Sequence, residues 1–213
     1  QTIFDFLNSQ GFKTISERLQ KNAFVINDIV LNKNDQNKKS EYKLINSKKD
    51  LENLIDNLIK AGFCSIDTET TSLNIESAKL IGISICYCED LSFYIPLNHL
   101  DKLTSKKVSN QLDEEYVLKK IKEICSNESI LKIGHNIKYD IRIFNKYKID
   151  VKSIADTMLM SYALDNGLTK HGMDDLAFYH FQHNCIKYKE LVGTGKKEIT
   201  FDYVPIDKAL DYA

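Results

Sequence analysis

Two acidic residues at the end of a predicted strand form the sharpest local pattern in the sequence. An apolar run from Phe63 leads into Asp67, and Glu69 follows two positions later. Because strand side chains alternate between faces, both carboxylates point to the same side of the sheet. Two carboxylates this close repel each other unless a proton or a cation lies between them, and Mg²⁺ or Mn²⁺ suits such oxygen ligands. The pair indicates a metal site, with a solvated strand end as the alternative.

A second candidate lies where another buried strand meets a helix. A strand predicted over residues 130–133 runs into Gly134–Asn136, and the following helix carries Asp140 in its first turn. The helix dipole stabilises an acid there without any function. The ends of strands next to helix starts are, however, where α/β sites collect polar groups. A third candidate, Asp207–Ala213, is by itself only the start of an amphipathic helix.

Together, the three segments resemble in order and spacing the motifs of the DnaQ-like 3′–5′ exonucleases with four acids and a tyrosine. The resemblance extends to the proofreading domain of bacterial DNA polymerase I and other family A polymerases, and it covers residues from about 45 to 213. It implies an RNase H-like α/β fold, a mixed sheet of three antiparallel strands followed by parallel strands, flanked by helices. Other matching motifs are Tyr94-Ile95-Pro96, Asp156-Thr157-Met158-Leu159, Met173-Asp174, Gly193-x-Gly195-Lys196 and Thr200-Phe201.

The resemblance implies catalytic roles for four residues. Asp67, Glu69 and Asp140 match the acids that bind two divalent metal ions, Mg²⁺ or Mn²⁺, and Tyr212 matches the tyrosine that orients the attacking water. A tyrosine of ordinary pKa is a poor base at neutral pH, so Tyr212 is expected to orient and not to abstract a proton. The family's fourth acid falls three positions beyond Ala213.

The resemblance also implies contacts with a single-stranded or frayed 3′ end of DNA. Leu73 matches a wedge against the terminal bases, and Tyr188 matches a stacking surface that tolerates any base. Thr70, His135 and Asn136 are expected where the sugar and phosphate of the terminal nucleotide bind. The alternatives are that Leu73 belongs to the core and that Tyr188 is an ordinary surface aromatic residue.

The elements that must position these residues follow from apolar periodicity. The pattern alternates strand and helix, which predicts a mixed α/β sheet with helices on its faces. The apolar stripe of the helix 158–164 is interpreted as core, and Asp156 as its N-cap. Strands are expected at 63–67, 80–87, 93–97, 130–133 and 151–155, and helices at 47–61, 113–126, 158–164, 172–181 and 206–213.

The composition and the N-terminal region indicate the class of protein and the domain boundaries. The 213 residues are 43% apolar and 28% charged, which is typical of a globular protein and excludes a mainly disordered or low-complexity chain. Residues 1–24 are predicted to form a short helical piece, and residues 31–43 are a polar stretch interpreted as a loop or linker. We therefore expect an N-terminal piece over 1–41 and an exonuclease domain over 42–213 that is truncated at its C-terminus.

Charge and cysteine usage bear on partners and compartment. The net charge of −1 provides no global basic field for nucleic acid, although a local patch is sufficient. The five scattered cysteines favour free thiols in a reducing compartment. We expect an intracellular protein, in an organelle such as the apicoplast or in the cytoplasm. No signal peptide or membrane span is predicted, so no membrane partner is expected.

The sequence leads to one function and two alternatives. We expect a 3′–5′ exonuclease that removes mispaired 3′ nucleotides from DNA during replication, with a covalently linked polymerase domain downstream. An RNA-trimming nuclease of the RNase D type shares the acids and the tyrosine. A catalytically inactive module that binds DNA or braces a polymerase is the other alternative.

Overall fold

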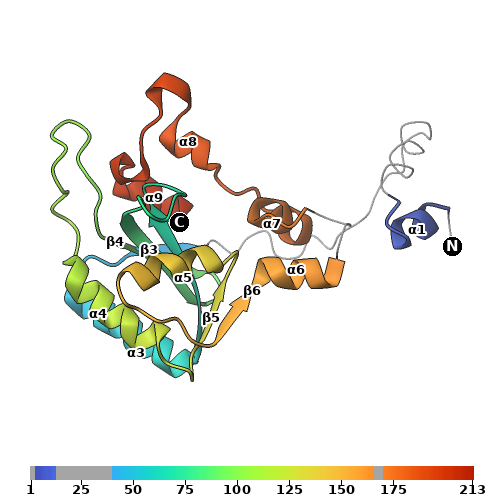
Figure 1. The fold of residues 1–213 in the computed structure, drawn as a ribbon, viewed down its shortest axis with the longest axis horizontal. Coiled ribbons are helices and arrows are strands. Elements are labelled where there is room, and N and C mark those ends of the chain that lie inside the picture. Colours follow the sequence, from blue (N-terminus) through green and yellow to red (C-terminus); the bar gives the residue numbers. More distant parts are fainter. Residues whose placement is uncertain (1–2, 13–39, 166–169) are drawn as a thin grey trace.

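One mixed sheet organises the described part of the chain, which in this computed structural model comprises residues 3–12, 40–165 and 170–213. Its strand order is β1-β4-β3-β2-β5-β6. The central strand β2 pairs antiparallel with β3 and parallel with β5, which places it in the middle of the sheet (Figure 1). The strands are β1 (Glu41–Leu44), β2 (Phe63–Thr70), β3 (Leu80–Cys88), β4 (Leu91–Pro96), β5 (Leu131–Gly134) and β6 (Ile154–Asp156).

The predicted sheet is confirmed in its centre and corrected at its two edges. Strands β2, β3 and β4 are antiparallel, and β5 and β6 run parallel, as expected. The interpretation of residues 31–43 as loop or linker is wrong at its end, because Glu41 to Leu44 pair with β4 as an edge strand. The first three side chains of β1 are exposed, so polar residues are tolerated in this strand. The last strand begins at Ile154, not at Val151. Residues 13–39 lie outside the described residues.

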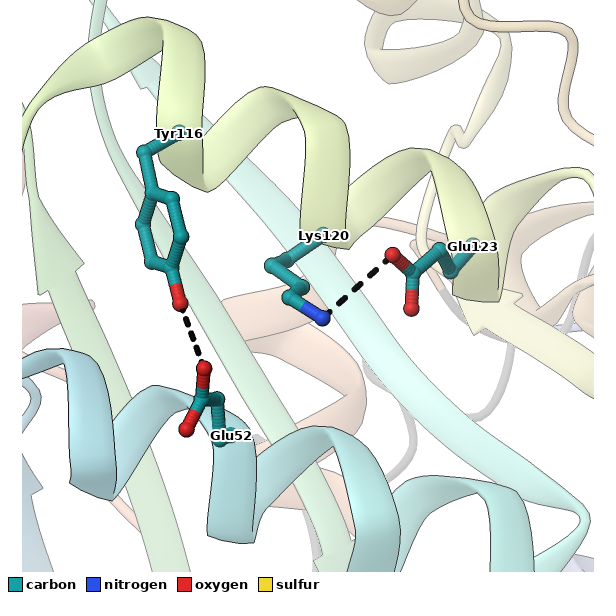
Figure 2. Close-up of polar contacts among 4 residues, drawn as sticks. All are labelled: Glu52, Tyr116, Lys120 and Glu123. Carbon is teal, nitrogen blue, oxygen red and sulfur yellow. Dashed lines mark hydrogen bonds and ion pairs between the residues drawn. The ribbon is translucent and has the colours of Figure 1, made fainter.

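Helices α3 (Lys48–Ala61) and α4 (Glu114–Cys125) pack side by side against one face of the sheet. Ser47 caps α3 by accepting a hydrogen bond from the Asp50 backbone N–H, and Gly62 ends it with a left-handed φ of 73°. Figure 2 shows a contact between the two helices at their exposed edge, where the Tyr116 hydroxyl donates a hydrogen bond to Glu52 across 2.8 Å. The buried face of α3 consists of Leu51, Leu54, Ile55 and Leu58.

The remaining helices, with one exception, lie close to their predicted positions. They are α1 (Ile3–Ser9), α5 (Lys138–Lys146), α6 (Thr157–Asp165), α7 (Met173–Phe181), α8 (Tyr188–Val192) and α9 (Ile206–Tyr212). Helix α8 was not predicted, and short 3-10 turns occupy Gly195–Lys197 and Phe201–Tyr203. Asp156 caps α6 as predicted, by accepting from the backbone N–H of Met158 at 2.9 Å.

The interpretation of the 158–164 stripe as core is wrong for the described structure. Leu159 is 61% exposed and Leu164 is 84% exposed. Figure 1 gives the reason, because α6 and α7 extend away from the sheet and the layers that cover it. An apolar helical stripe indicates which side of a helix is apolar, but not which element covers it.

Two buried clusters lie on opposite faces of the sheet. The larger one joins the sheet to α3, α4 and α5, and includes Ile66 of β2 and Ile83 of β3. The smaller one joins Ile81 and Tyr94 to the C-terminal segment, where Phe201 and Ala209 are fully buried. All five cysteines are free thiols, as expected. Among the described residues, no helix has the length and apolar character needed to cross a bilayer.

Candidate active site

Strand β2 carries the two acids of the first motif on the face covered by the C-terminal segment. Asp67 and Glu69 pair in register with Ser84 and Gly82 of β3, and both acids line the same cleft. Glu69 is only 8% exposed. The predicted proximity of the two carboxylates therefore holds, and it follows from the two-residue period of the strand.

Asp140 reaches the same region from the opposite face of the sheet. It lies in the first turn of α5 and is 2% exposed. One of its carboxylate oxygens accepts from the backbone N–H of Thr68 at 2.9 Å and also from the Thr68 hydroxyl. Thr68 stands between the two acids of β2, and its side chain points to the other face of the strand, towards α5. Thr68 thus connects the second motif to the first.

Burial and mutual repulsion disfavour charge on all three acids. Burial raises the pKa of Glu69 to about 8, and the nearby charges of Asp67 and Asp140 add to the shift. Burial also raises the pKa of Asp67, with a further contribution from Asp140. For Asp140 the burial effect again dominates, although the two bonds from Thr68 lower its pKa in part. A compensating positive charge at this position would reverse these effects.

Tyr212 lies beside the acids, within a group of aromatic rings. Its ring centroid is 5.9 Å from that of Phe201 and 6.4 Å from that of Tyr188. Burial and the charges of Glu69 and Asp67 raise the pKa of Tyr212 well above its ordinary value. The phenol therefore keeps its proton at neutral pH and can donate a hydrogen bond. The C-terminal helix thus places a donor, and not a base, at the cleft.

A cleft of about 480 Å³ brings all nine predicted site residues together. Leu73 is 89% exposed at this cleft, so the alternative that it belongs to the core is wrong. Tyr188 is 42% exposed and stacks on Phe201 with ring planes 10° apart. The lining includes Asp67, Glu69, Thr70, Leu73, His135, Asn136, Asp140, Tyr188 and Tyr212. An adjoining cleft of about 420 Å³ shares five of them, Asp67, Glu69, His135, Tyr188 and Tyr212.

Several supporting residues of the cleft were missed by sequence reasoning. The Tyr139 hydroxyl lies in hydrogen-bonding contact with the Thr70 hydroxyl and donates to the Ser72 carbonyl at 2.7 Å. The imidazole Nδ1 of His135 lies 3.0 Å from the Thr157 hydroxyl oxygen. The Thr70 and His135 contacts join residues far apart in the sequence, so no local pattern indicates them. For Thr157, its place in the motif Asp156-Thr157-Met158-Leu159 was the available signal.

The chemistry of the donor set fits a hard divalent cation. Three carboxyl groups converge, and each is held largely away from water. Over residues 3–12, 40–165 and 170–213, no three His, Cys, Asp or Glu side chains form a ready-made cage for one ion. Mg²⁺ does not need such a cage, because it is commonly bound by one or two carboxylates together with waters and substrate phosphates.

Comparison with known proteins identifies the family. Residues 42–213 match the family model of the 3′–5′ exonuclease domain of family A DNA polymerases. The chain belongs to this 3′–5′ exonuclease family. Exonucleases of this family normally use divalent metals, in agreement with the carboxyl groups at the cleft. The predicted family and the predicted enzyme class are therefore confirmed.

The relatives of this exonuclease domain are much longer proteins. DNA polymerase I of Rhizobium leguminosarum is 38% identical over 165 residues, which are 71% of this chain and 16% of that protein. DNA polymerase I of Pseudomonas aeruginosa is 36% identical over 159 residues, 73% of this chain and 17% of that protein. The chain thus spans about a sixth of the length of these curated relatives.

A solved nuclease structure supports the fold of the exonuclease domain. Escherichia coli RNase D, an exoribonuclease involved in structured RNA processing, superposes with a TM-score of 0.53 at 16% identity. The match covers 80% of this chain and 44% of that one. At this identity the likeness concerns the fold, and the predicted RNase H-like α/β class is confirmed by it together with the strand order.

Proposed function

We propose that this domain removes single nucleotides from the 3′ end of DNA, as the proofreading part of a larger DNA polymerase. The observation that carries the proposal is the convergence of Asp67, Glu69, Asp140 and Tyr212 at one cleft. These are the four residues of this chain that match the family's catalytic positions. A polymerase domain joined downstream is part of the proposal, supported by relatives that are DNA polymerases I.

Asp67, Glu69 and Asp140 are the residues that would hold two divalent ions. Such a metal pair supplies a water of lowered pKa and neutralises charge on the leaving oxygen. The chain's own contribution is to place carboxylates that are poorly solvated and repel one another. Glu69 and Asp67 stand on one rigid strand, and Thr68 holds Asp140 beside them. The protein thus fixes the ligands and does not need to supply a covalent nucleophile.

Tyr212 is proposed to orient the attacking water by donating a hydrogen bond. Its raised pKa keeps the phenol protonated at neutral pH, which suits a donor and excludes a role as general base. Contacts with Phe201 and Tyr188 hold its ring in place. A water held between this phenol and the carboxylates would approach the terminal phosphate from a fixed direction.

The other cleft residues are proposed to bind the terminal nucleotides. Exposed Leu73 would act as a wedge against the last bases, and half-exposed Tyr188 would stack on a base. Thr70, His135 and Asn136, which line the same cleft, are proposed to contact the sugar and phosphate. None of these contacts reads base identity, which agrees with an editing enzyme that must accept any mispaired end.

A direct assay is degradation of a 5′-labelled single-stranded DNA oligonucleotide by the full-length protein in Mg²⁺ or Mn²⁺. We expect a ladder that shortens from the 3′ end, that EDTA abolishes, and that Asp67→Ala lacks. Glu76→Gln, which changes an exposed carboxylate outside the cleft, is the matched control and should remain active.

Two results would overturn the proposal. Tight DNA binding without shortening, in a folded protein loaded with metal, would identify an inactive binding module. Faster shortening of an RNA oligonucleotide of the same sequence would identify an RNA-trimming nuclease, the function carried by the structurally similar RNase D.

A further inference from the structure

One carboxylate outside the catalytic set joins the starts of two helices. Asp156, the last residue of β6, accepts four backbone N–H groups. Its Oδ1 accepts from Asn136 at 3.1 Å, from Met158 at 2.9 Å and from Leu159 at 3.3 Å. Within the part of the chain that the structure describes, its Oδ2 accepts from Ile137 alone, at 3.1 Å. Asp156 therefore serves α5 and α6 at once, although the sequence indicates a cap for α6 alone.

Helix α5 depends on this outside partner because it has no side-chain cap of its own. Its N-cap position is Ile137, which cannot accept a hydrogen bond through its side chain. The preceding Asn136 has a left-handed φ of 59°, an uncommon conformation for a residue other than glycine. The unpaired N–H groups at a helix start need acceptors. From the neighbouring strand, Asp156 accepts one of them, the N–H of Ile137, together with the N–H of the preceding Asn136.

The following residue reinforces the same turn. The Thr157 hydroxyl lies within donating distance of the Gly134 carbonyl, at 3.2 Å, which leaves its oxygen free to accept from His135 Nδ1 at 3.0 Å. Gly134 and Asp156 are also paired in register between β5 and β6. Figure 1 shows these strands side by side, each leading into its helix. Two consecutive residues thus hold the segment that connects β5 to the helix of Asp140.

We propose that Asp156 is a positioning residue of the exonuclease site, which fixes the start of α5 and thereby the placement of Asp140. The proposal rests on the proposed function, because it concerns the geometry of the same cleft. Asp140 lies three residues after Ile137, within the turn that Asp156 anchors. A shift of this turn would move the Asp140 carboxylate relative to Asp67 and Glu69, while β2 itself stays in place.

Asp156→Asn separates this role from simple helix capping. An asparagine keeps one carbonyl oxygen, which can retain the Oδ1 bonds that cap α6. Its amide group then replaces Oδ2 and presents N–H donors to the N–H of Ile137. The matched control is Asp113→Asn at the start of α4, because Asp113 accepts from the Tyr116 N–H at 2.9 Å and does not line the cleft.

The test compares both variants and the unchanged full-length protein by three measurements. These are the affinity for Mn²⁺ by titration, the hydrogen exchange of the Ile137 amide, and kcat and KM on single-stranded DNA. For Asp156→Asn we expect Mn²⁺ affinity and kcat to fall on the order of tenfold, as is usual for residues that orient metal ligands. The Ile137 amide should exchange faster. Asp113→Asn keeps its capping oxygen and should lower at most the melting temperature, through the loss of a negative charge at the start of α4.

Equal behaviour of the two variants, with a lower Tm and unchanged Mn²⁺ affinity, would reduce Asp156 to a helix cap and overturn the proposal. The readouts also separate this proposal from the proposed function. If the unchanged protein degrades no DNA, the exonuclease function fails. The positioning role is then decided by the Mn²⁺ affinity and the exchange of Ile137, neither of which requires turnover.

Discussion

Neutralising Glu69 should stabilise the metal-free protein at alkaline pH. The pKa of this buried carboxyl is about 8, against an ordinary 4.5, so the folded state holds a proton that the unfolded chain has released. Between these two values the folded protein binds more protons, and stability falls as pH rises. At 1.36 kcal/mol per pKa unit, the shift corresponds to a cost of about 5 kcal/mol above pH 8. Because water enters the cleft, the actual loss of folding stability on ionisation of Glu69 is about 2–5 kcal/mol.

The variant Glu69→Gln keeps the shape of the side chain and removes this cost. In EDTA at pH 8.5 its melting temperature should exceed that of the unchanged protein by at least about 4 °C, since 1 kcal/mol shifts Tm by about 2–4 °C at this size. At pH 5 the two should melt within about 2 °C of each other. Adding Mg²⁺ at pH 8.5 should stabilise the unchanged protein more than the variant, because metal binding favours the folded state.

Thermal unfolding followed by circular dichroism at both pH values measures these differences. Glu76→Gln is the control, because it removes an exposed carboxylate that does not line the cleft. Should Glu69→Gln melt no higher than the unchanged protein at pH 8.5, the idea that the metal-free acids destabilise the fold would be refuted.

Three further changes test the packing and the cleft. Gly82→Ala would place a methyl group against the buried ring of Tyr94 and should lower the free energy of unfolding in urea by about 1–3 kcal/mol. An unchanged free energy of unfolding would show that the ring moves aside. Ser47→Ala removes the cap of α3 and should cost about 1 kcal/mol while leaving nuclease activity unchanged. Tyr188→Ala should raise KM for single-stranded DNA about 5- to 100-fold, whereas Tyr188→Phe should not, if stacking is its role.

The parts of the fold that could be predicted are those with local signals. Helices α3 and α4 have apolar residues at helical spacing and are capped by Ser47 and Asp113, so their bounds were predicted within one residue. Strand β1 lacks such a signal, because an edge strand with exposed side chains has no apolar alternation. The exposure of α6 depends on what lies next to it in space, and a periodic pattern carries no such information.

The same distinction applies to the candidate site. The closeness of Asp67 and Glu69 follows from strand alternation alone, whereas the closeness of Asp140 depends on the parallel pairing of β2 with β5. The resemblance to a known family implies that relation, which no local pattern in the sequence indicates. Thr68 was missed as a partner of Asp140, because one of its two donors is a backbone N–H, which every residue except proline possesses.

The acids of the site are thus held by elements of different rigidity. Asp67 and Glu69 share one strand in the centre of the sheet, so their separation changes little whenever the sheet is formed. Asp140 stands on a short helix, and Asp156 fixes the start of that helix. Thr68 fixes the Asp140 carboxylate itself. Its distance from the pair therefore depends on a few hydrogen bonds. Changes in β6 should consequently alter metal affinity before they alter stability, even though no residue of β6 lines the main cleft.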